Sequence, residues 1–151
     1  MATSLHLLAD PHGDWDLLPR AAAGEVQAAA DLFDGHGMAV LASTRTVLGP
    51  RHDEKAADDI VVAAFVAACR GARWDGEQPR TVLVRAAVDG CLSHAKTQDL
   101  RSRALLALTV YGRMTCRQAS AFLGIDPEID ALEVRELWRE LRLLLDPPRP
   151  A

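Results

Sequence analysis

The sequence predicts an all-α fold of two small helical domains joined by a very short linker. Hydrophobic residues make up 49% of the chain, which is enough to bury a core, while aromatic residues make up only 5%. Alanine and leucine supply most of the apolar positions, and both lose little conformational freedom in a helix. Apolar residues also recur at the spacing of an amphipathic helix, and glycine or proline separates these segments.

Five helices are predicted in the N-terminal part, over residues 14–22, 25–33, 38–48, 53–70 and 80–96. Gly24, His36-Gly37 and Gly49-Pro50 are expected to end the first three. The residues expected to face the core from the second and third are Val26, Ala29, Ala30, Phe33, Val40, Leu41, Thr44 and Leu48. In the fourth, acids crowd the first turn and Ile60, Val61, Ala64, Phe65 and Ala68 repeat at helical spacing.

The pattern restarts at Asp99, and the apolar run from Leu105 predicts a helix that Gly112 closes. A short helix over 115–123 follows, because Thr115 and Gln118 form a capping-box pattern and Gly124 ends the segment. A longer helix is predicted over 130–145 before a proline-rich tail. The expected divisions are therefore a flexible N-terminus (1–13), a first domain (14–96), a linker (97–103), a second domain (104–145) and a tail (146–151).

The helix, glycine turn, short capped helix and longer helix of the second domain have the order of a helix-turn-helix. In the last helix, winding at about 100° per residue places Arg135, Arg139 and Arg142 on one exposed flank. These arginines suit contacts to phosphates, whereas a solvated face with Glu/Arg pairs is the alternative. Acids at the start of this helix favour the alternative, because carboxylates near phosphates repel.

The net charge of −4 argues against binding of nucleic acid by bulk electrostatics. Residues 1–96 carry 13 acids against 9 Lys/Arg, and residues 97–151 carry 8 of each, so any nucleic-acid contact must be local. No apolar run approaches the roughly 18 residues of a membrane span, and Met1 to Asp10 lack a secretory signal pattern. We expect a cytoplasmic protein.

Catalysis, a cofactor and a metal site are not expected. Five histidines are scattered without a ligand spacing, and there is no dinucleotide fingerprint, P-loop or nucleophile elbow. Cys69, Cys91 and Cys116 lie far apart in apolar helical contexts, so we expect small buried hydrophobes. His36, next to Gly37, is expected at a helix end.

From about Asp14 to Arg142, the chain resembles the extracytoplasmic-function group of bacterial RNA polymerase sigma factors, in the sigma-70 family. The motifs that carry the resemblance are Asp16-Leu17-Leu18-Pro19-Arg20, Leu32-Phe33-Asp34, Ala57-Asp58-Asp59-Ile60-Val61 with Phe65, Gly112-Arg113-Met114-Thr115 and Ala121-Phe122-Leu123-Gly124-Ile125. The resemblance implies a region 2-like bundle and a region 4-like helix-turn-helix. It also implies core RNA polymerase and promoter DNA as partners.

The resemblance also implies site residues. Asp58, Asp59, Val62 and Phe65 match the helix that binds polymerase in the family. The DNA-binding residues would be Arg113, Thr115, Arg117, Gln118, Arg135 and Arg139.

The departures from the family lie on its functional surfaces. Val62-Ala63 replace the usual polar pair, and Val88-Asp89-Gly90 followed by Ser93-His94-Ala95-Lys96 replace a basic surface on the fifth helix. The linker is far shorter than the family needs to thread the polymerase. A second hypothesis therefore stays open: a degenerate sigma-like interaction module without productive DNA binding, which engages an anti-sigma factor or another regulator.

Overall fold

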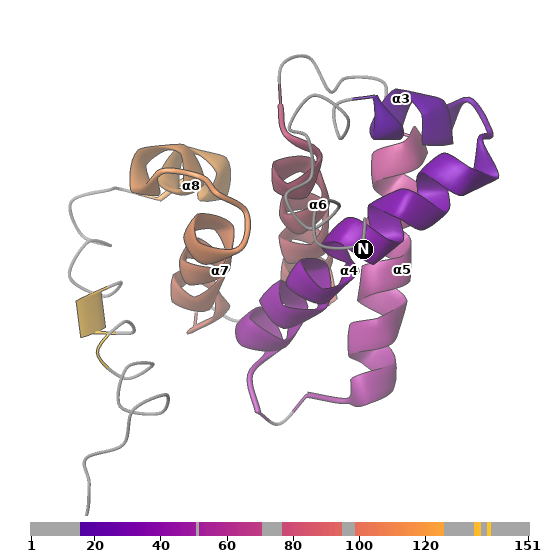
Figure 1. The fold of residues 1–151 in the computed structure, drawn as a ribbon. Helices are drawn as coiled ribbons and strands as arrows, with labels where there is room; N and C mark the ends of the chain where they lie inside the picture. Colours follow the sequence, from indigo (N-terminus) through magenta and orange to yellow (C-terminus); the bar gives the residue numbers. More distant parts are fainter. Residues whose placement is uncertain are drawn as a thin grey trace, which may run out of the picture.

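A computed structural model describes residues 16–50, 52–70, 77–94 and 99–125, together with Arg135, Glu136 and Arg139. These residues form helices and connecting turns without a strand, so the all-α prediction is confirmed for the described part of the chain. The helices are α3 (Leu17–Ala22), α4 (Val26–Leu48), α5 (Glu54–Arg70), α6 (Pro79–His94), α7 (Asp99–Val110) and α8 (Cys116–Leu123). Figure 1 shows α4 crossing α5 and α6, with α7 and α8 beside them. No helix in the described ranges has the length and apolar character to cross a membrane.

Helix α4 is continuous over 23 residues, and the predicted break at His36-Gly37 is wrong. Both residues are buried inside the helix. Arg80 of α6 donates from Nε to His36 Nδ1 at 3.2 Å and from Nη2 to the Gly35 carbonyl at 3.2 Å. A glycine within a helix costs only about 1 kcal/mol relative to alanine. Packing of a long helix against α5, α6 and α7 offsets that cost.

The buried stripe of α4 differs from the predicted one in the first half of the helix. Ala28, Leu32 and His36 are buried, whereas the four residues expected to face the core are exposed: Val26, Ala29, Ala30 and Phe33. Because the helix continues, its buried stripe runs through His36 to Val40 and Val47. In the second half, Val40 and Thr44 are buried as expected, and Leu41 and Leu48 are partly buried.

Helix α5 confirms the prediction for the fourth helix closely. It begins at Glu54, and the Asp53 carboxylate just before it accepts a hydrogen bond from the Lys55 backbone N–H at 3.1 Å. The apolar residues packed into the core are Ile60, Val61, Ala64 and Ala68. Phe65, also expected to face inward, is only partly buried.

Helix α6 packs against α4, α5 and α7. Its buried residues are Pro79, Val82, Leu83, Val84, Ala87, Val88 and Cys91. Of the three cysteines, Cys91 is buried and Cys69 partly buried, but Cys116 is exposed at the start of α8, contrary to expectation. Burial raises the pKa of the Cys91 thiol to about 12, and this thiol lies 3.9 Å from the Thr44 carbonyl oxygen.

Helix α7 begins at Asp99, within residues 97–103 that were expected to be a linker. Leu100, Ala104, Leu105 and Leu108 are buried and belong to the same core cluster as residues of α3 to α6. The helix packs against α4 and α6. At the end of α4, Gly49 adopts φ 84°, and the Arg103 guanidinium of α7 occupies the space that a Cβ would need there. The division of the chain into two domains stays a prediction.

Helix α8 begins as the sequence predicts. The Thr115 hydroxyl accepts a hydrogen bond from the Gln118 backbone N–H at 3.1 Å, and Gln118 Oε1 accepts one from the Thr115 N–H at 3.0 Å. Gly124 ends the helix in the left-handed conformation. The predicted helix over 130–145 lies outside the described residues, except for Arg135, Glu136 and Arg139, which are helical and exposed.

Candidate functional site

The exposed side of α5 holds all four residues that the sequence assigned to polymerase binding. Asp58 and Asp59 are exposed, the Val62 side chain is 59% exposed, and Phe65 is half-buried. Residues four and seven apart share one face of a helix, so Asp58, Val62 and Phe65 point to the same side. Helix α5 therefore presents an apolar strip, Val62 and Phe65, and the Asp58 and Asp59 carboxylates precede this strip along the helix.

Helix α4 extends this strip. The rings of Phe33 and Phe65 lie 5.2 Å apart between centroids at an angle of 49°. Phe33 is 53% exposed and its ring lies over Gly37, 3.6 Å from where a Cβ would stand. Val66 is also exposed. We call Phe33, Val62, Phe65 and Val66 the α4–α5 patch.

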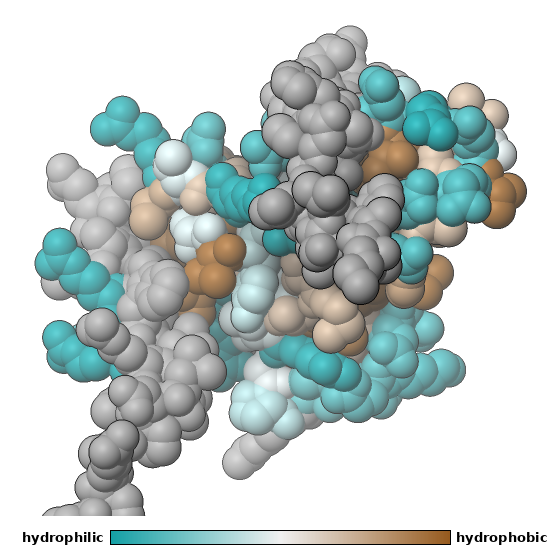
Figure 2. Space-filling model, in the orientation of Figure 1, coloured by the Kyte–Doolittle hydropathy of each residue, from teal (hydrophilic) through white to brown (hydrophobic). Residues whose placement is uncertain are grey.

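The α4–α5 patch combines two aromatic rings with two exposed valines. Single exposed apolar side chains are common, but contiguous ones mark surfaces that contact other molecules. Figure 2 shows separate hydrophobic residues, in brown, among hydrophilic ones on the face that it draws. The sequence flagged Val62 and Phe65 but placed Phe33 in the core. Its exposure follows only from the continuity of α4.

The residues expected to bind DNA do not form one set of free side chains. Thr115 and Gln118 are engaged in the capping box, where each bonds the backbone of the other. Arg117 is exposed on α8, and Arg113 is exposed with Nη1 3.4 Å from Gln78 Oε1. Arg135 and Arg139 are exposed, but their surroundings lie outside the described part of the chain. Arg113 and Arg117 thus remain the cations that α8 and its preceding turn can offer to a phosphate.

The α7–α8 segment is locally basic although the whole chain is acidic. Residues 99–125 carry four arginines, at 101, 103, 113 and 117, and one aspartate. This local excess is what a short-range phosphate contact requires when the net charge is −4.

The apolar and small residues at 88–91 of α6 have a structural role. Val88 and Cys91 are fully buried, and a Cβ at Gly90 would lie 3.2 Å from Ile60 Cγ2 of α5. Val88 and Gly90 therefore serve the close packing of α6 on α5. Of the polar residues here, Ser93 is exposed but donates its hydroxyl to the Asp89 carbonyl at 3.0 Å.

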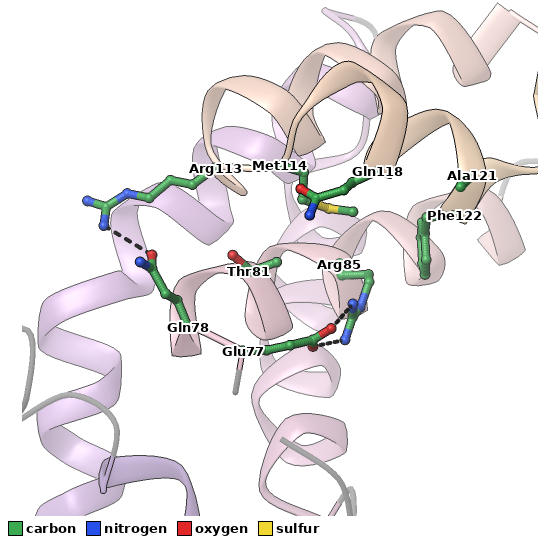
Figure 3. A pocket seen from close by; sticks show the side chains of 9 residues that line it. All are labelled: Glu77, Gln78, Thr81, Arg85, Arg113, Met114, Gln118, Ala121 and Phe122. Carbon is green, nitrogen blue, oxygen red and sulfur yellow. Dashed lines mark hydrogen bonds and ion pairs between the residues drawn. The ribbon is translucent and has the colours of Figure 1, made fainter. Parts of the chain in front are cut away.

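An open cleft of about 530 Å³ lies between α6 and the α8 side of the molecule (Figure 3). It is lined by Glu77, Gln78, Thr81, Arg85, Arg113, Met114, Gln118, Ala121 and Phe122. We call it the α6–α8 cleft. Sequence reasoning missed it, because its walls come from separate segments that only the tertiary fold brings together.

Several contacts join the walls of the α6–α8 cleft. The Thr81 hydroxyl donates to the Gly112 carbonyl at 2.7 Å. Arg85 forms a two-point ion pair with Glu77, and its Cζ lies 5.7 Å from the centroid of the Phe122 ring. The hydrogen bonds from Arg85 hold the pKa of the Glu77 carboxyl below its usual value. The Thr81 hydrogen bond joins α6 to the turn after α7, and the Arg85–Phe122 contact joins α6 to α8.

Among the described residues, no group of three or more His, Cys, Asp or Glu side chains is placed to hold a metal ion. His36, expected at a helix end, is instead buried within α4 and accepts a hydrogen bond from Arg80.

Comparisons of the chain with protein-family models, with curated proteins and with solved structures found no match. The resemblance to sigma factors therefore depends on the sequence motifs quoted above.

Proposed function

We propose that the chain is a sigma-factor-like protein of transcription initiation, which binds core RNA polymerase and approaches promoter DNA. The observation that carries the proposal is the α4–α5 patch. It exposes Phe33, Val62, Phe65 and Val66 beside the Asp58 and Asp59 carboxylates. An apolar centre with charges at its rim is the usual composition of a protein–protein interface. The motif Ala57 to Val61, which resembles the polymerase-binding helix of sigma factors, lies in the same helix.

The DNA-binding part of the proposal draws on α7 and α8. The capped helix, the left-handed Gly124 after it and the local excess of arginine agree with a helix-turn-helix that contacts phosphates. Arg113 and Arg117 are exposed next to the cap, and Arg135 and Arg139 are exposed further along. The same chain would thus hold polymerase through α4 and α5 and DNA through its C-terminal part.

A second candidate is a degenerate sigma-like module that binds an anti-sigma factor or another regulator without productive DNA binding. The contacts across the α6–α8 cleft favour it, because the Arg85–Phe122 contact joins α6 to α8 and Thr81 bonds the Gly112 carbonyl in the turn before α8. A helix-turn-helix fixed in this way has less freedom to dock on DNA. Thr115 and Gln118 are also committed to the cap rather than to bases.

Binding to core bacterial RNA polymerase tests the proposal. The full chain is compared with Val62→Asp, which places a charge in the centre of the α4–α5 patch. Ala67→Asp is the matched control, because Ala67 is exposed on the same helix about 140° away. We expect the wild-type chain and the control to bind and Val62→Asp to bind at least about tenfold more weakly. Equal affinity of all three would show that the patch is not the polymerase-binding surface.

The DNA contacts are tested separately, by the salt dependence of binding to promoter fragments. We expect Arg135→Ala and Arg139→Ala each to weaken binding and to reduce the slope of log affinity against log salt by about 1. Arg70→Ala, at the end of α5, removes the same charge far along the chain and serves as the control. Unchanged slopes in both test variants would remove these arginines from the interface. No DNA binding combined with no polymerase binding would favour the second candidate.

A further inference from the structure

We propose that the α6–α8 cleft is a docking groove for an extended segment of a partner protein. The segment carries an acidic side chain toward one end of the groove and an apolar side chain toward the other. The cleft and the α4–α5 patch share no residue, so docking of this segment does not depend on polymerase binding.

The α6–α8 cleft is elongated, with different chemistry at its two ends. Gln78, Thr81 and Arg85 are spaced by three and four residues, so they lie along one face at the start of α6. This wall extends for about 10 Å, at about 1.5 Å per residue. Figure 3 shows Arg113 directed toward Gln78 at one end and Phe122 near Arg85 at the other. A compact ligand would reach only one end, whereas an extended chain reaches both.

The end beside Gln78 supplies a positive charge. The Arg113 side chain is exposed, and its Nη1 donates to Gln78 Oε1 at 3.4 Å, which is a long hydrogen bond to a neutral group. No carboxylate in the described part of the chain pairs with this arginine. A guanidinium presents several N–H donors in a plane that matches the two oxygens of a carboxylate. This end therefore favours an acidic side chain.

The backbone of Arg113 gives a second, independent observation. With φ 57°, Arg113 is the one residue other than glycine with a positive φ in the described ranges. This conformation is uncommon for a residue with a Cβ and favours glycine. An arginine kept there at a cost in strain indicates a role for its side chain.

Polar groups in the middle of the cleft suit the backbone of a peptide. Gln118 Oε1 accepts the Thr115 N–H, so the carboxamide NH₂ is the part of this side chain left to donate. The Thr81 hydroxyl gives its proton to the Gly112 carbonyl, and its oxygen can still accept a hydrogen bond. A peptide backbone offers the matching carbonyl and N–H groups.

The end beside Arg85 is apolar. Ala121 and Phe122 contribute to it, and Phe122 is 40% exposed although it is aromatic. Arg85 Cζ lies 5.7 Å from the centroid of the Phe122 ring, and a two-point ion pair with Glu77 balances the charge of this arginine. Because these two charges balance, burial of the exposed ring under an apolar side chain is the main attraction that this end offers.

A protein segment fits this cleft better than a nucleic-acid strand does. A strand carries a charge at every phosphate, whereas Arg113 is the one cation of the cleft lining whose charge is not balanced. Arg113 is also a proposed phosphate contact, so a segment seated in the cleft would keep this arginine from DNA. That last consequence rests on the proposed function, and docking of the segment does not.

The test titrates the isotope-labelled full chain with the peptide acetyl-Ala-Asp-Ala-Ala-Phe-Ala-amide and follows it by two-dimensional NMR. In a polyproline II conformation its Asp and Phe lie on one side, about 9 Å apart, which suits the length of the cleft. We expect saturable shifts at the amides of Arg113, Gln118 and Phe122. The control peptide acetyl-Ala-Asp-Phe-Ala-Ala-Ala-amide has the same composition but reaches only one end. It should bind at least about fivefold more weakly.

Variants of the chain test the two ends separately. Arg113→Gly removes the cation while glycine suits the positive φ, so the fold is retained, and we expect about fivefold weaker binding. Phe122→Ala removes the exposed ring and should weaken binding by about tenfold. Arg117→Ala removes an exposed arginine outside the cleft lining and should leave affinity unchanged.

Four results would overturn the proposal. They are the absence of saturable shifts, equal binding of the two peptides, shifts confined to one end of the cleft, and binding by Arg113→Gly at wild-type affinity. Single-stranded oligothymidylate is titrated in parallel. If it shifts the same amides and binds more tightly than the first peptide, the cleft is a nucleic-acid site and the proposal is wrong.

Discussion

Two glycines of the chain have opposite surroundings. A Cβ at Gly112 would lie 2.6 Å from the Leu108 carbonyl oxygen and 3.2 Å from Val84 Cγ1, so α6 and the end of α7 approach each other only because the side chain is absent. At Gly35, in the middle of α4, a Cβ would meet nothing within 4 Å. Close packing therefore requires glycine at position 112, whereas position 35 has room for a larger side chain.

Alanine substitutions at Gly112 and Gly35 should change stability in opposite directions. We expect Gly112→Ala to lower the free energy of unfolding by about 1–3 kcal/mol through overpacking. Gly35→Ala should raise it by about 1 kcal/mol, because alanine is the better helix former at an open position. Urea denaturation of both variants measures the two changes. A stabilised Gly112→Ala protein would contradict the close packing of α6 on the turn after α7.

The three cysteines differ in exposure and should differ in reactivity. Cys116 is exposed, Cys69 is partly buried, and burial raises the pKa of both Cys69 and Cys91. Because the thiolate is the reactive form, we expect a thiol reagent to label Cys116 first, Cys69 more slowly and Cys91 only after unfolding. Mass spectrometry of a labelling time course gives this order. Early modification of Cys91 would contradict its place in the core.

The Cys91 thiol also makes stability depend on alkaline pH. Its pKa in the folded protein is about 12, against 9.0 for an unperturbed thiol, so the folded state holds the proton more tightly. This contribution is present below about pH 9 and is lost as pH rises toward 12. We expect the free energy of unfolding of Cys91→Ala to fall less steeply than that of the wild type between about pH 9 and pH 12. Denaturation at a series of pH values measures this difference.

At the scale of the element, the capping box of α8 could be predicted and α4 could not. Thr115, Gln118 and Gly124 act through neighbours in the sequence, so their pattern alone defines both ends of the helix. In α4 the local preference of Gly35 and Gly37 opposes the helix, while packing against α3, α5, α6 and α7 favours it. Tertiary contacts decide whether α4 continues through these glycines, and the pattern of neighbouring residues in the sequence gives no information about such contacts.

The same difference explains which parts of the candidate site were found. Asp58, Asp59, Val62 and Phe65 lie on one helix, where the resemblance to the polymerase-binding helix predicts them together. Phe33 was assigned to the core. In the first half of α4, helical spacing fits the exposed face that holds Phe33 as well as the buried face that holds Ala28 and Leu32. The α6–α8 cleft needed the fold, since Arg85 and Phe122 are far apart in the chain.

The capping box should stabilise α8 measurably. We expect Thr115→Ala to lower the free energy of unfolding by about 0.5–2 kcal/mol, because the Gln118 N–H loses its acceptor. Cys116→Ala, one residue further and exposed, makes no cap and should change stability by no more than about 0.5 kcal/mol. Thermal or urea unfolding compares the two. Equal effects would mean that the cap does not stabilise the helix.

At the scale of the whole molecule, one core cluster joins α3 through α8. Leu105 of α7 is 1% exposed and packs in the same cluster as Leu32 of α4 and Leu83 of α6. The sequence predicted two domains on either side of residues 97–103, whereas α7 begins inside that range. Burial of α7 against α4 is a long-range contact that the spacing of apolar residues did not reveal.

A shared core implies shared unfolding. We expect Leu105→Ala to lower the free energy of unfolding by about 2–5 kcal/mol and to reduce hydrogen-exchange protection in α4 as much as in α7. Val110→Ala, at an exposed position near the end of α7, is the control and should leave both helices protected. Loss of protection in α7 alone would show that α7 unfolds as part of a separate unit.

The charge distribution bears on function at this scale as well. Residues 16–94 carry eleven acids and eight Lys/Arg, whereas residues 99–125 carry one acid and four arginines. The N-terminal part thus offers carboxylates and the α4–α5 patch, and the segment after it offers cations. This separation fits a chain that meets a protein through one part and phosphates through the other.

Run-off transcription by core bacterial RNA polymerase loaded with this chain tests the central claim most directly. We expect promoter-dependent transcripts with the wild-type chain and with Ala67→Asp, and their loss with Val62→Asp, which alters the centre of the α4–α5 patch. Absence of transcripts with the wild-type chain, when polymerase and promoter are active with a known sigma factor, would contradict a working sigma-like function. It would direct the search toward protein partners of the α4–α5 patch.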